Sequence, residues 1–474
     1  MEEFIAILQN LWQIGNHSIA LSLFLRLLGA VYFLAFLSLM SQAKGLFGKN
    51  GILPARDYLA YTKRLGLKRW YYIPTLFWLN SSDGMMMALC AIGLLAGILL
   101  FFGVFPLLML LTLYVCYLSF KSVGQEFLSF QWDILLLEAG FAGIFIAASG
   151  LHPAAILIAW FLFLKFMVMA GAVKLTSKDP NWRNLTAMKY HYETQPLPNP
   201  ISWHAHHLPL WFHKASVLGM LLIEIGLPFI IFGPPEARLL VFAAEAFLQL
   251  AIQLTGNYGP FNFFTAVLAI PLLDDQYLAP LASLSLELPA LIPPAVFPAI
   301  VLAFVLLNAL RMLQLSKINL PGSGLLRALE PFEICNPYGI FAVMTTKRFE
   351  IIPEWSNDGK KWHEYEFRWK PQDLSKDPRL ALMHMPRLDW LMWFLPFSSC
   401  QYNPWFLRFM EKLLLNSPDA VALLKSAPAD PPRFVRALAY EYEFTDQKTR
   451  KRTKMAWSRK FAGEYAPPMS LRDL

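Results

Sequence analysis

The residues whose types and spacing could do chemistry are concentrated between residues 174 and 213. This segment holds a cluster of titratable side chains that includes His191, Glu193, His204, His206, His207 and His213. Histidine is the commonest metal ligand, so a metal site is one interpretation. The H-x-H-H run lacks the H-x-x-x-H and H-x-x-E-H spacings of metalloproteases, and we therefore predict no metal. The alternative is an amphipathic loop at a membrane interface, anchored by Trp203 and Trp211.

A polar stripe interrupts one of the apolar segments further along the chain. Glu245, Gln249 and Gln253 recur every four residues, so they share one face of a predicted helix. The stripe either supplies hydrogen bonds between helices or forms the polar wall of a cavity.

Other charged residues also fall within apolar segments. Glu138 and Lys165 lie deep in theirs and are expected to be paired, because an isolated charge in a membrane is costly. Lys121, Asp133 and Lys174 lie near segment ends, where a long side chain can extend to the membrane surface. Lys165 and Lys174 are nine residues apart and should face opposite sides of their helix.

The composition excludes an ordinary soluble protein. The chain has 474 residues, of which 56% are hydrophobic and 16% charged, against about 25% charged in a typical globular protein. Apolar stretches fill residues 19–315, whereas residues 316–474 are mixed and charged. We therefore predict an α-helical multi-pass membrane domain over residues 1–320 and an extramembrane domain over residues 330–474.

A membrane span needs about 20 mostly apolar residues, and about nine segments are candidate spans. They are 19–42, 84–103, 106–122, 132–149, 153–174, 215–233, 237–254, 260–273 and 293–315. The first exceeds the apolar region of a signal peptide and no A-x-A site follows, so we expect an uncleaved helix. With nine spans, the long segments 43–83 and 175–214 lie on the same side as the C-terminal domain, and function is expected there.

The C-terminal domain is predicted to be β-rich and sandwich-like. Gly339–Thr346 and Phe349–Trp355 are typical of strands, and a tight turn at Ser356–Gly359 predicts a hairpin that returns over Trp362–Trp369. Arg433–Phe444 and Met455–Tyr465 are further predicted strands. Helices are expected at 389–395 and 404–415, and the basic residues 448–454 are expected to form a solvated loop.

Several functions lack support in the sequence. The net charge of +8 comes largely from residues beside predicted spans, so nucleic acid is not expected as a partner. The four cysteines have no C-x-x-C spacing, which gives no support to a disulfide scaffold or a dithiol motif. The chain contains no G-x-S-x-G, P-loop or G-x-G-x-x-G motif, which leaves lipase, ATPase and dinucleotide-binding functions unsupported.

Seven segments carry a resemblance to a known family. They are GLFGKNGILPARDYL at 45–59, Asp179–Thr186 with YHYETQPLPNP at 190–200, Asn336–Thr346, Asp358–Trp362, EYEF at 364–367 and PRLDW at 386–390. These segments closely resemble the lipase maturation factors, and the resemblance runs through most of the chain. It implies a membrane protein of the endoplasmic reticulum, or of the inner membrane in a bacterium, that helps secreted lipases such as lipoprotein lipase to fold and assemble. The compact chain favours a prokaryotic source.

The same resemblance implies that the long loops and the C-terminal domain face the lumen. The basic residues of 43–83 place that face in the cytoplasm by the positive-inside rule. We follow the resemblance, because the charge rule is weaker for long loops.

A second resemblance concerns a lysine. Ala170–Leu175 at the end of a span, followed by Trp182, is similar to the transmembrane part of vitamin K-dependent γ-carboxylases, in which a lysine of an A-G-x-K-K-L element is the active base. Lys174 is the matching position, although Val173 stands where the carboxylases have another lysine. A desolvated lysine loses its charge readily and could then act as a base. The alternative is a lysine that extends to the membrane surface.

Two hypotheses of function follow. The first is a folding factor for lipases, with membrane lipid and secreted lipases as partners and no cofactor. The second is a membrane-embedded enzyme acting on a lipophilic substrate, with a bound lipid or quinone-like molecule. Its predicted catalytic residues are Lys174, His191 and Glu193. Predicted binding residues are Trp182, Tyr190, Tyr192, Gln195, Trp203, Glu245 and Gln249. The oligomeric state is left open.

Overall fold

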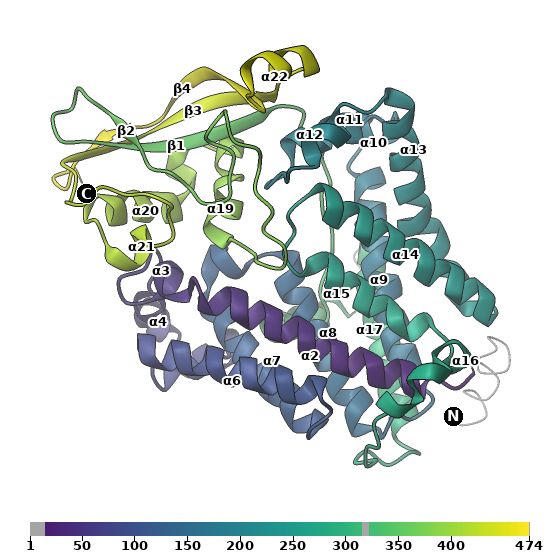
Figure 1. Cartoon of the computed structure of the whole chain (residues 1–474). Coiled ribbons are helices and arrows are strands. Elements are labelled where there is room, and N and C mark those ends of the chain that lie inside the picture. The colour runs from purple at the N-terminus through teal and green to yellow at the C-terminus, as the bar shows by residue number, and fades with distance from the viewer. Residues whose placement is uncertain (1–14, 315–321, 474) are drawn as a thin grey trace.

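The computed structural model describes residues 15–314 and 322–473, and it is mostly helical (Figure 1). The helices of the bundle are α2 (Ser18–Met40), α6 (Asp83–Phe101), α7 (Pro106–Val123), α8 (Gln131–Ala148), α9 (Ala155–Thr176), α13 (Leu210–Leu221), α14 (Pro235–Thr255), α15 (Phe261–Ala269) and α17 (Phe297–Leu313). A helix therefore occupies each of the nine predicted segments, and the multi-pass helical fold is confirmed.

Seven helices in the described part of the chain are long and apolar enough to cross a membrane. The sixth of them runs over Leu210–Phe232, because α13 continues through a π-helical turn at Leu222–Gly226 and a 3-10 helix. Two further apolar helices, over Phe261–Leu272 and Phe297–Leu313, are shorter. The count of nine crossings stays a prediction.

Short helices connect the long ones or belong to the C-terminal part. They are α3 (Ala43–Phe47), α4 (Ala55–Thr62), α5 (Arg69–Tyr72), α10 (Pro180–Arg183), α11 (Met188–Thr194), α12 (Ser202–His206), α16 (Asp275–Leu278), α18 (Ser323–Leu329), α19 (Arg387–Met392), α20 (Pro404–Leu414), α21 (Pro418–Val421) and α22 (Gln447–Thr453). Local capping explains several of the helix starts. Ser82 accepts a hydrogen bond from the Met85 amide at the start of α6, and Asp179 accepts one from the Asn181 amide at the start of α10.

Helix α2 packs closely against α6 because glycines face each other where the two helices meet. A Cβ atom placed on Gly29 would lie 2.8 Å from the carbonyl oxygen of Gly97 in α6, and one on Gly97 would lie 2.9 Å from that of Gly29. Such close backbone contact supplies packing energy where lipid provides little hydrophobic drive for helix association.

Two buried acidic side chains inside the bundle, Glu138 and Asp133, are paired with cations. The predicted pairing of Glu138 is confirmed, since its carboxylate accepts a hydrogen bond from Lys165 and another, of 2.6 Å, from the Tyr338 hydroxyl. The prediction that Asp133 extends to the membrane surface is wrong. Asp133 is fully buried and binds Arg387 of the C-terminal part through both carboxylate oxygens, at 2.7 and 2.9 Å.

Both long loops contact the C-terminal part: in Figure 1, α3 and α4 lie below α20 and α21, and α10, α11 and α12 lie beside the sheet. Ser417 donates a 2.6 Å hydrogen bond to the Asn50 carbonyl, and Trp182 donates one of 3.0 Å to the Phe341 carbonyl. The short connections meet at the other end, where Asp275 accepts hydrogen bonds from the first amides of α2. The predicted clustering of residues 43–83 and 175–214 beside the C-terminal part agrees with these contacts.

The C-terminal part contains one four-stranded antiparallel sheet backed by helices, rather than two packed sheets. Its strands are β1 (Arg348–Ser356), β2 (His363–Glu364), β3 (Phe434–Phe444) and β4 (Trp457–Met469), in the order β2-β1-β3-β4. The predicted β1–β2 hairpin is confirmed, and the two further predicted strands are present as β3 and β4, which pair with each other. Val435 and Ala437 on one face of β3 belong to the main hydrophobic core, which joins the sheet to the bundle.

Three local predictions for this part are wrong or only partly right. Gly339–Thr346 is not a strand, because its amides bond to side chains of the bundle and its loops, Gly339 to Gln131 and Met344 to Asp179. The predicted return strand over 362–369 is reduced to β2. The basic segment forms α22, whose first turn is capped by Asp446 at 2.7 Å from the Thr449 amide. The division into 1–320 and 330–474 stays a prediction, and residues 315–321 lie outside the described residues.

Candidate functional site

Lys174 at the end of α9 is buried in an ion pair rather than extended to the membrane surface, so that prediction is corrected. Its Nζ atom lies 2.6 and 2.9 Å from the carboxylate oxygens of Glu224 and 3.0 Å from the Ala170 carbonyl. Glu224 sits in the π-helical turn, and such turns occur often at functional sites. A Cβ atom on Gly171 would lie 3.0 Å from the Cβ of Glu224, so only glycine lets the two segments approach this closely.

The predicted polar stripe on α14 lies close to this ion pair. Glu245 is fully buried and accepts a 2.8 Å hydrogen bond from Gln249. Its carboxyl group is near enough to that of Glu224 for the two to repel each other electrostatically. Gln253 accepts a 3.1 Å bond from Asn262 on α15. Within the described residues, Oε2 of Glu245 has no hydrogen-bond partner. Gln253 therefore joins α14 to α15, whereas one carboxylate oxygen of Glu245 has no hydrogen-bond partner among the described residues.

His191 on α11 faces the aromatic residues above the bundle. Its Nε2 atom lies 3.1 Å from the hydroxyl of Tyr258, which donates to Gln195 at 3.0 Å. Burial, with the nearby charge of Lys174, lowers the pKa of His191 to about 4. The imidazole is therefore neutral at pH 7, and its ring packs against Phe341 with 5.1 Å between centroids.

Glu193 points away from His191 because residues two apart on a helix face different directions. Its Oε1 atom accepts a 2.5 Å hydrogen bond from the Phe444 amide at the end of β3. It lines a cleft of about 540 Å³ between the 175–214 loop and the sheet, together with Tyr190, His206 and Lys347. Burial raises the pKa of Glu193 to about 7, although the Phe444 amide opposes that shift.

The Glu193 carboxyl should make stability depend on pH. The folded protein holds its proton up to about pH 7, whereas the unfolded chain releases it near the ordinary value of 4.5. Its contribution is therefore complete below pH 4.5 and is lost as the pH rises to 7. We expect Glu193→Gln to raise the free energy of unfolding by about 2–3 kcal/mol at pH 8 and to leave it unchanged at pH 4.

Thermal unfolding of the detergent-solubilised protein across this pH range would measure the effect. The exposed Glu464→Gln is a matched control with no expected pH-dependent difference. A Glu193→Gln protein whose unfolding curve keeps the native pH dependence would contradict the assignment.

The predicted binding residues hold the 175–214 loop against neighbouring segments. Trp203 donates a 2.9 Å hydrogen bond to the Thr445 carbonyl, and the Tyr192 ring packs between those of His191 and His213. Gln195 is buried and donates to the Thr255 carbonyl at 2.7 Å. These contacts tie the loop to the end of α14 and to the β3–β4 connection.

The three predicted catalytic residues thus have separate partners. Lys174 is paired with Glu224, His191 with Tyr258, and Glu193 with an amide of the sheet. Lys174 and His191 are close enough for the lysine charge to affect the imidazole, and Glu193 faces another cleft. Glu224, Tyr258 and Arg348 also contribute to these contacts, although no sequence motif singles them out.

Arg348 is the residue that joins the loop to the sheet. It is 2% exposed and donates hydrogen bonds to the carbonyls of Glu193 at 3.0 Å, Gln195 at 2.5 Å and Pro196 at 3.0 Å. Its guanidinium also binds Glu350 at 2.5 Å. Arg348 directly precedes a predicted strand and belongs to no recognised motif, so the sequence did not indicate this role.

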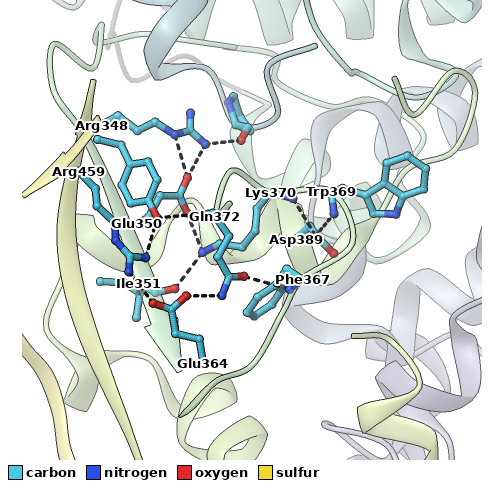
Figure 2. A network of polar contacts seen from close by, with 12 residues as sticks. Arg348, Glu350, Ile351, Glu364, Phe367, Trp369, Lys370, Gln372, Asp389 and Arg459 are labelled. Carbon is cyan, nitrogen blue, oxygen red and sulfur yellow. Dashed lines mark hydrogen bonds and ion pairs between the residues drawn. The ribbon is translucent and has the colours of Figure 1, made fainter. Parts of the chain in front are cut away.

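A buried polar network continues from Arg348 under the sheet (Figure 2). Glu350 also binds Lys370 at 2.8 Å, and the Lys370 amide donates to Asp389 at 3.0 Å. Further along, Gln372 and Arg459 both bind Glu364, at 3.0 and 2.8 Å. The network includes residues of the EYEF and PRLDW segments, which explains why polar residues are buried there. Within residues 15–314 and 322–473, no group of three or more histidine, cysteine or acidic side chains could hold a metal ion.

The fold and the site define a polytopic membrane protein whose C-terminal part, with its antiparallel sheet, is joined to the helical bundle by a buried ion pair between Asp133 and Arg387. The family model described as the lipase maturation factor transmembrane domain matches residues 19–280, and the lipase maturation factor C-terminal domain matches residues 334–467. This chain belongs to the lipase maturation factor family.

Individual relatives cover nearly the whole chain. Lipase maturation factor 2 of Xenopus laevis is 32% identical over 97% of this chain and 83% of its own length. Human lipase maturation factor 2 is 33% identical over 95% of this chain and 82% of its own. Lipase maturation factor 1 of Bos taurus is 33% identical over 95% and 89%. No solved structure matches the chain.

Proposed function

We propose that this chain acts as a membrane-anchored lipase maturation factor, which helps a lipase to reach its folded and assembled form. The observation that carries this proposal is the similarity to relatives of that name over 95% or more of the chain. Similarity over both the membrane part and the sheet supports a shared function better than similarity of a bundle alone.

The open face of the sheet is our candidate surface for the client. Phe461 on the edge strand β4 is 58% exposed, and its ring packs on that of Tyr440. Arg459 lies over the Tyr440 ring at 4.6 Å, and Arg436 over Trp362 at 4.1 Å. Exposed aromatic rings beside cations can bind both apolar and acidic parts of an incompletely folded chain.

The alternative of a γ-carboxylase-like enzyme is not favoured, because the matched models and the named relatives carry lipase maturation names. The catalytic roles of Lys174, His191 and Glu193 stay predictions. The contacts support a structural role for the Lys174–Glu224 pair, since it connects α9 to the π-helical turn.

We further propose that the sheet and the 175–214 loop face the exoplasmic side, where secreted lipases pass. The membrane would be the endoplasmic reticulum in a eukaryote or the inner membrane in a bacterium. A compartment-sensitive reporter fused to the C-terminus tests the orientation, and a cytoplasmic signal would contradict it.

Deletion of the gene is expected to lower the specific activity of a secreted lipase without lowering lipase synthesis, because the lipase would no longer be helped to its folded and assembled form. Expression of the native chain in the deleted cells should restore the specific activity of the lipase, whereas expression of the Tyr440→Ser/Phe461→Ser variant should not. Tyr402→Ser is the matched control, because Tyr402 is 79% exposed but lies outside the sheet.

Lipase activity and lipase protein would be measured separately in the same cells. Unchanged specific activity after deletion would overturn the proposed function. Full restoration by the Tyr440→Ser/Phe461→Ser variant would overturn only the choice of client surface.

A further inference from the structure

An exposed apolar surface lies where α13 begins. Trp211, in the first turn of this candidate span, is 68% exposed, and Leu210 beside it is 49% exposed. Ile201 and Leu208 in the preceding segment are also exposed. A large aromatic side chain at the start of a span typically lies at the level of the lipid headgroups. Such exposed apolar side chains at the start of a candidate span are typical of a segment that lies at a membrane interface.

The basic helix α22 is held beside the same segment. The guanidinium of Arg450 lies over the ring of Trp203 at 4.2 Å, and Trp203 donates to the Thr445 carbonyl just before α22. His206, four residues before Leu210, packs its ring against Phe444 with 5.5 Å between centroids. In Figure 1, α22 lies on the same side of the bundle as α12 and the start of α13.

The other basic residues of this helix and its C-cap point into solvent. Lys448, Lys451, Arg452 and Lys454 are all exposed. Within the described residues none of these four has an acidic partner within ion-pair distance, whereas Arg450 is bound to Asp377 at 2.8 Å. Four unpaired cations therefore project from a helix that is packed against the segment leading into the membrane.

We propose that α22 and the 201–211 segment form a binding surface for the headgroups of anionic phospholipids in the membrane that holds the protein. The exposed apolar residues insert at the interface, and the four cations bind phosphate and carboxylate groups. Each Lys or Arg beside an anionic membrane surface strengthens binding about fivefold. With the orientation proposed above, the anionic lipid that α22 binds belongs to the exoplasmic leaflet. An acidic protein segment would match the charges but would leave Trp211 and Leu210 unexplained, which is why lipid is favoured.

The test uses the full chain reconstituted in nanodiscs, with a fluorophore attached at Thr453→Cys, an exposed position on α22. Lipids that carry a quencher on the headgroup report how close α22 lies to the membrane. We expect quenching to rise about twofold when about 30 mol % phosphatidylserine or phosphatidylglycerol replaces phosphatidylcholine, and to fall again in high salt. The native cysteines are buried, so labelling of a protein without Thr453→Cys sets the background.

Replacing all four unpaired cations by glutamine should abolish the rise with anionic lipid. Lys360→Gln/Lys361→Gln, in the exposed turn between β1 and β2, removes charge elsewhere and should leave the rise intact. Equal quenching in neutral and anionic nanodiscs, or a rise that survives the fourfold substitution, would overturn the proposal. An acidic peptide that changes the emission of the same fluorophore in neutral nanodiscs, in a way that the fourfold substitution removes, while anionic lipid causes no rise in quenching, would assign the surface to a protein partner instead and would leave the proposed lipase function untouched.

Discussion

Replacing Asp133 by alanine is expected to lower the free energy of unfolding by about 3–5 kcal/mol, because it leaves a buried arginine without its partner. Asp133 on α8 binds Arg387 with both oxygens at 2.7 and 2.9 Å, and it accepts a 2.5 Å hydrogen bond from the Tyr117 hydroxyl. Both charged residues are at most 1% exposed. Unfolding of the detergent-solubilised protein, followed by tryptophan fluorescence, would measure the loss.

The pair connects the bundle to the C-terminal part, so its loss should loosen the junction as well as the helix. Asp133→Leu combined with Arg387→Met removes both charges and should recover most of the lost stability, since an apolar pair of similar volume replaces a buried ion pair at little cost. Lys347→Ala is the matched control, because the Lys347–Glu441 pair is exposed and should cost less than about 1 kcal/mol. A loss in Asp133→Ala no larger than in this control would contradict the assignment.

Replacing Arg348 by alanine should have an effect of similar size, about 3–5 kcal/mol, because Glu350 and three backbone carbonyls lose a donor in a buried site. Those carbonyls belong to residues 193–196 of the YHYETQPLPNP segment. The loop should therefore detach from the sheet and become sensitive to proteolysis between residues 175 and 214. Limited proteolysis and thermal unfolding of the same sample would report both changes.

Arg348→Lys separates charge from geometry. Lysine keeps the positive charge beside Glu350 but cannot reach three carbonyls with a planar guanidinium, so an intermediate loss of about 1–2 kcal/mol is expected. Arg433→Ala, at an exposed position just before β3, should change neither readout. If Arg348→Ala left the 175–214 loop as resistant to protease as in the native protein, Arg348 would not be its anchor.

The membrane architecture could be predicted because hydropathy is a property of each short segment. Nine apolar segments gave nine helices, and the Ser356–Gly359 turn gave the β1–β2 hairpin. The family resemblance was equally local, since strings such as YHYETQPLPNP are contiguous. The single sheet of the C-terminal part, in place of the predicted sandwich, could not be predicted in this way, because the hydrogen bonds of residues 339–346 go to bundle and loop side chains more than 150 residues away.

The candidate site shows the same limit. The sequence located Lys174, His191 and Glu193 in one region, but it grouped them by their distance along the chain. Only the tertiary structure decided their partners. Lys174 pairs with Glu224 in the π-helical turn, and Glu193 accepts a hydrogen bond from the amide at the end of β3.

The sequence by itself determined which segments are apolar, where the long loops fall and which family the motifs resemble. Only the tertiary structure decided which charges meet, as with Asp133 and Arg387, which are separated by 254 positions. The physical reason is that burial of a charge depends on the summed packing of several helices, whereas the hydropathy of a helix depends on its own residues.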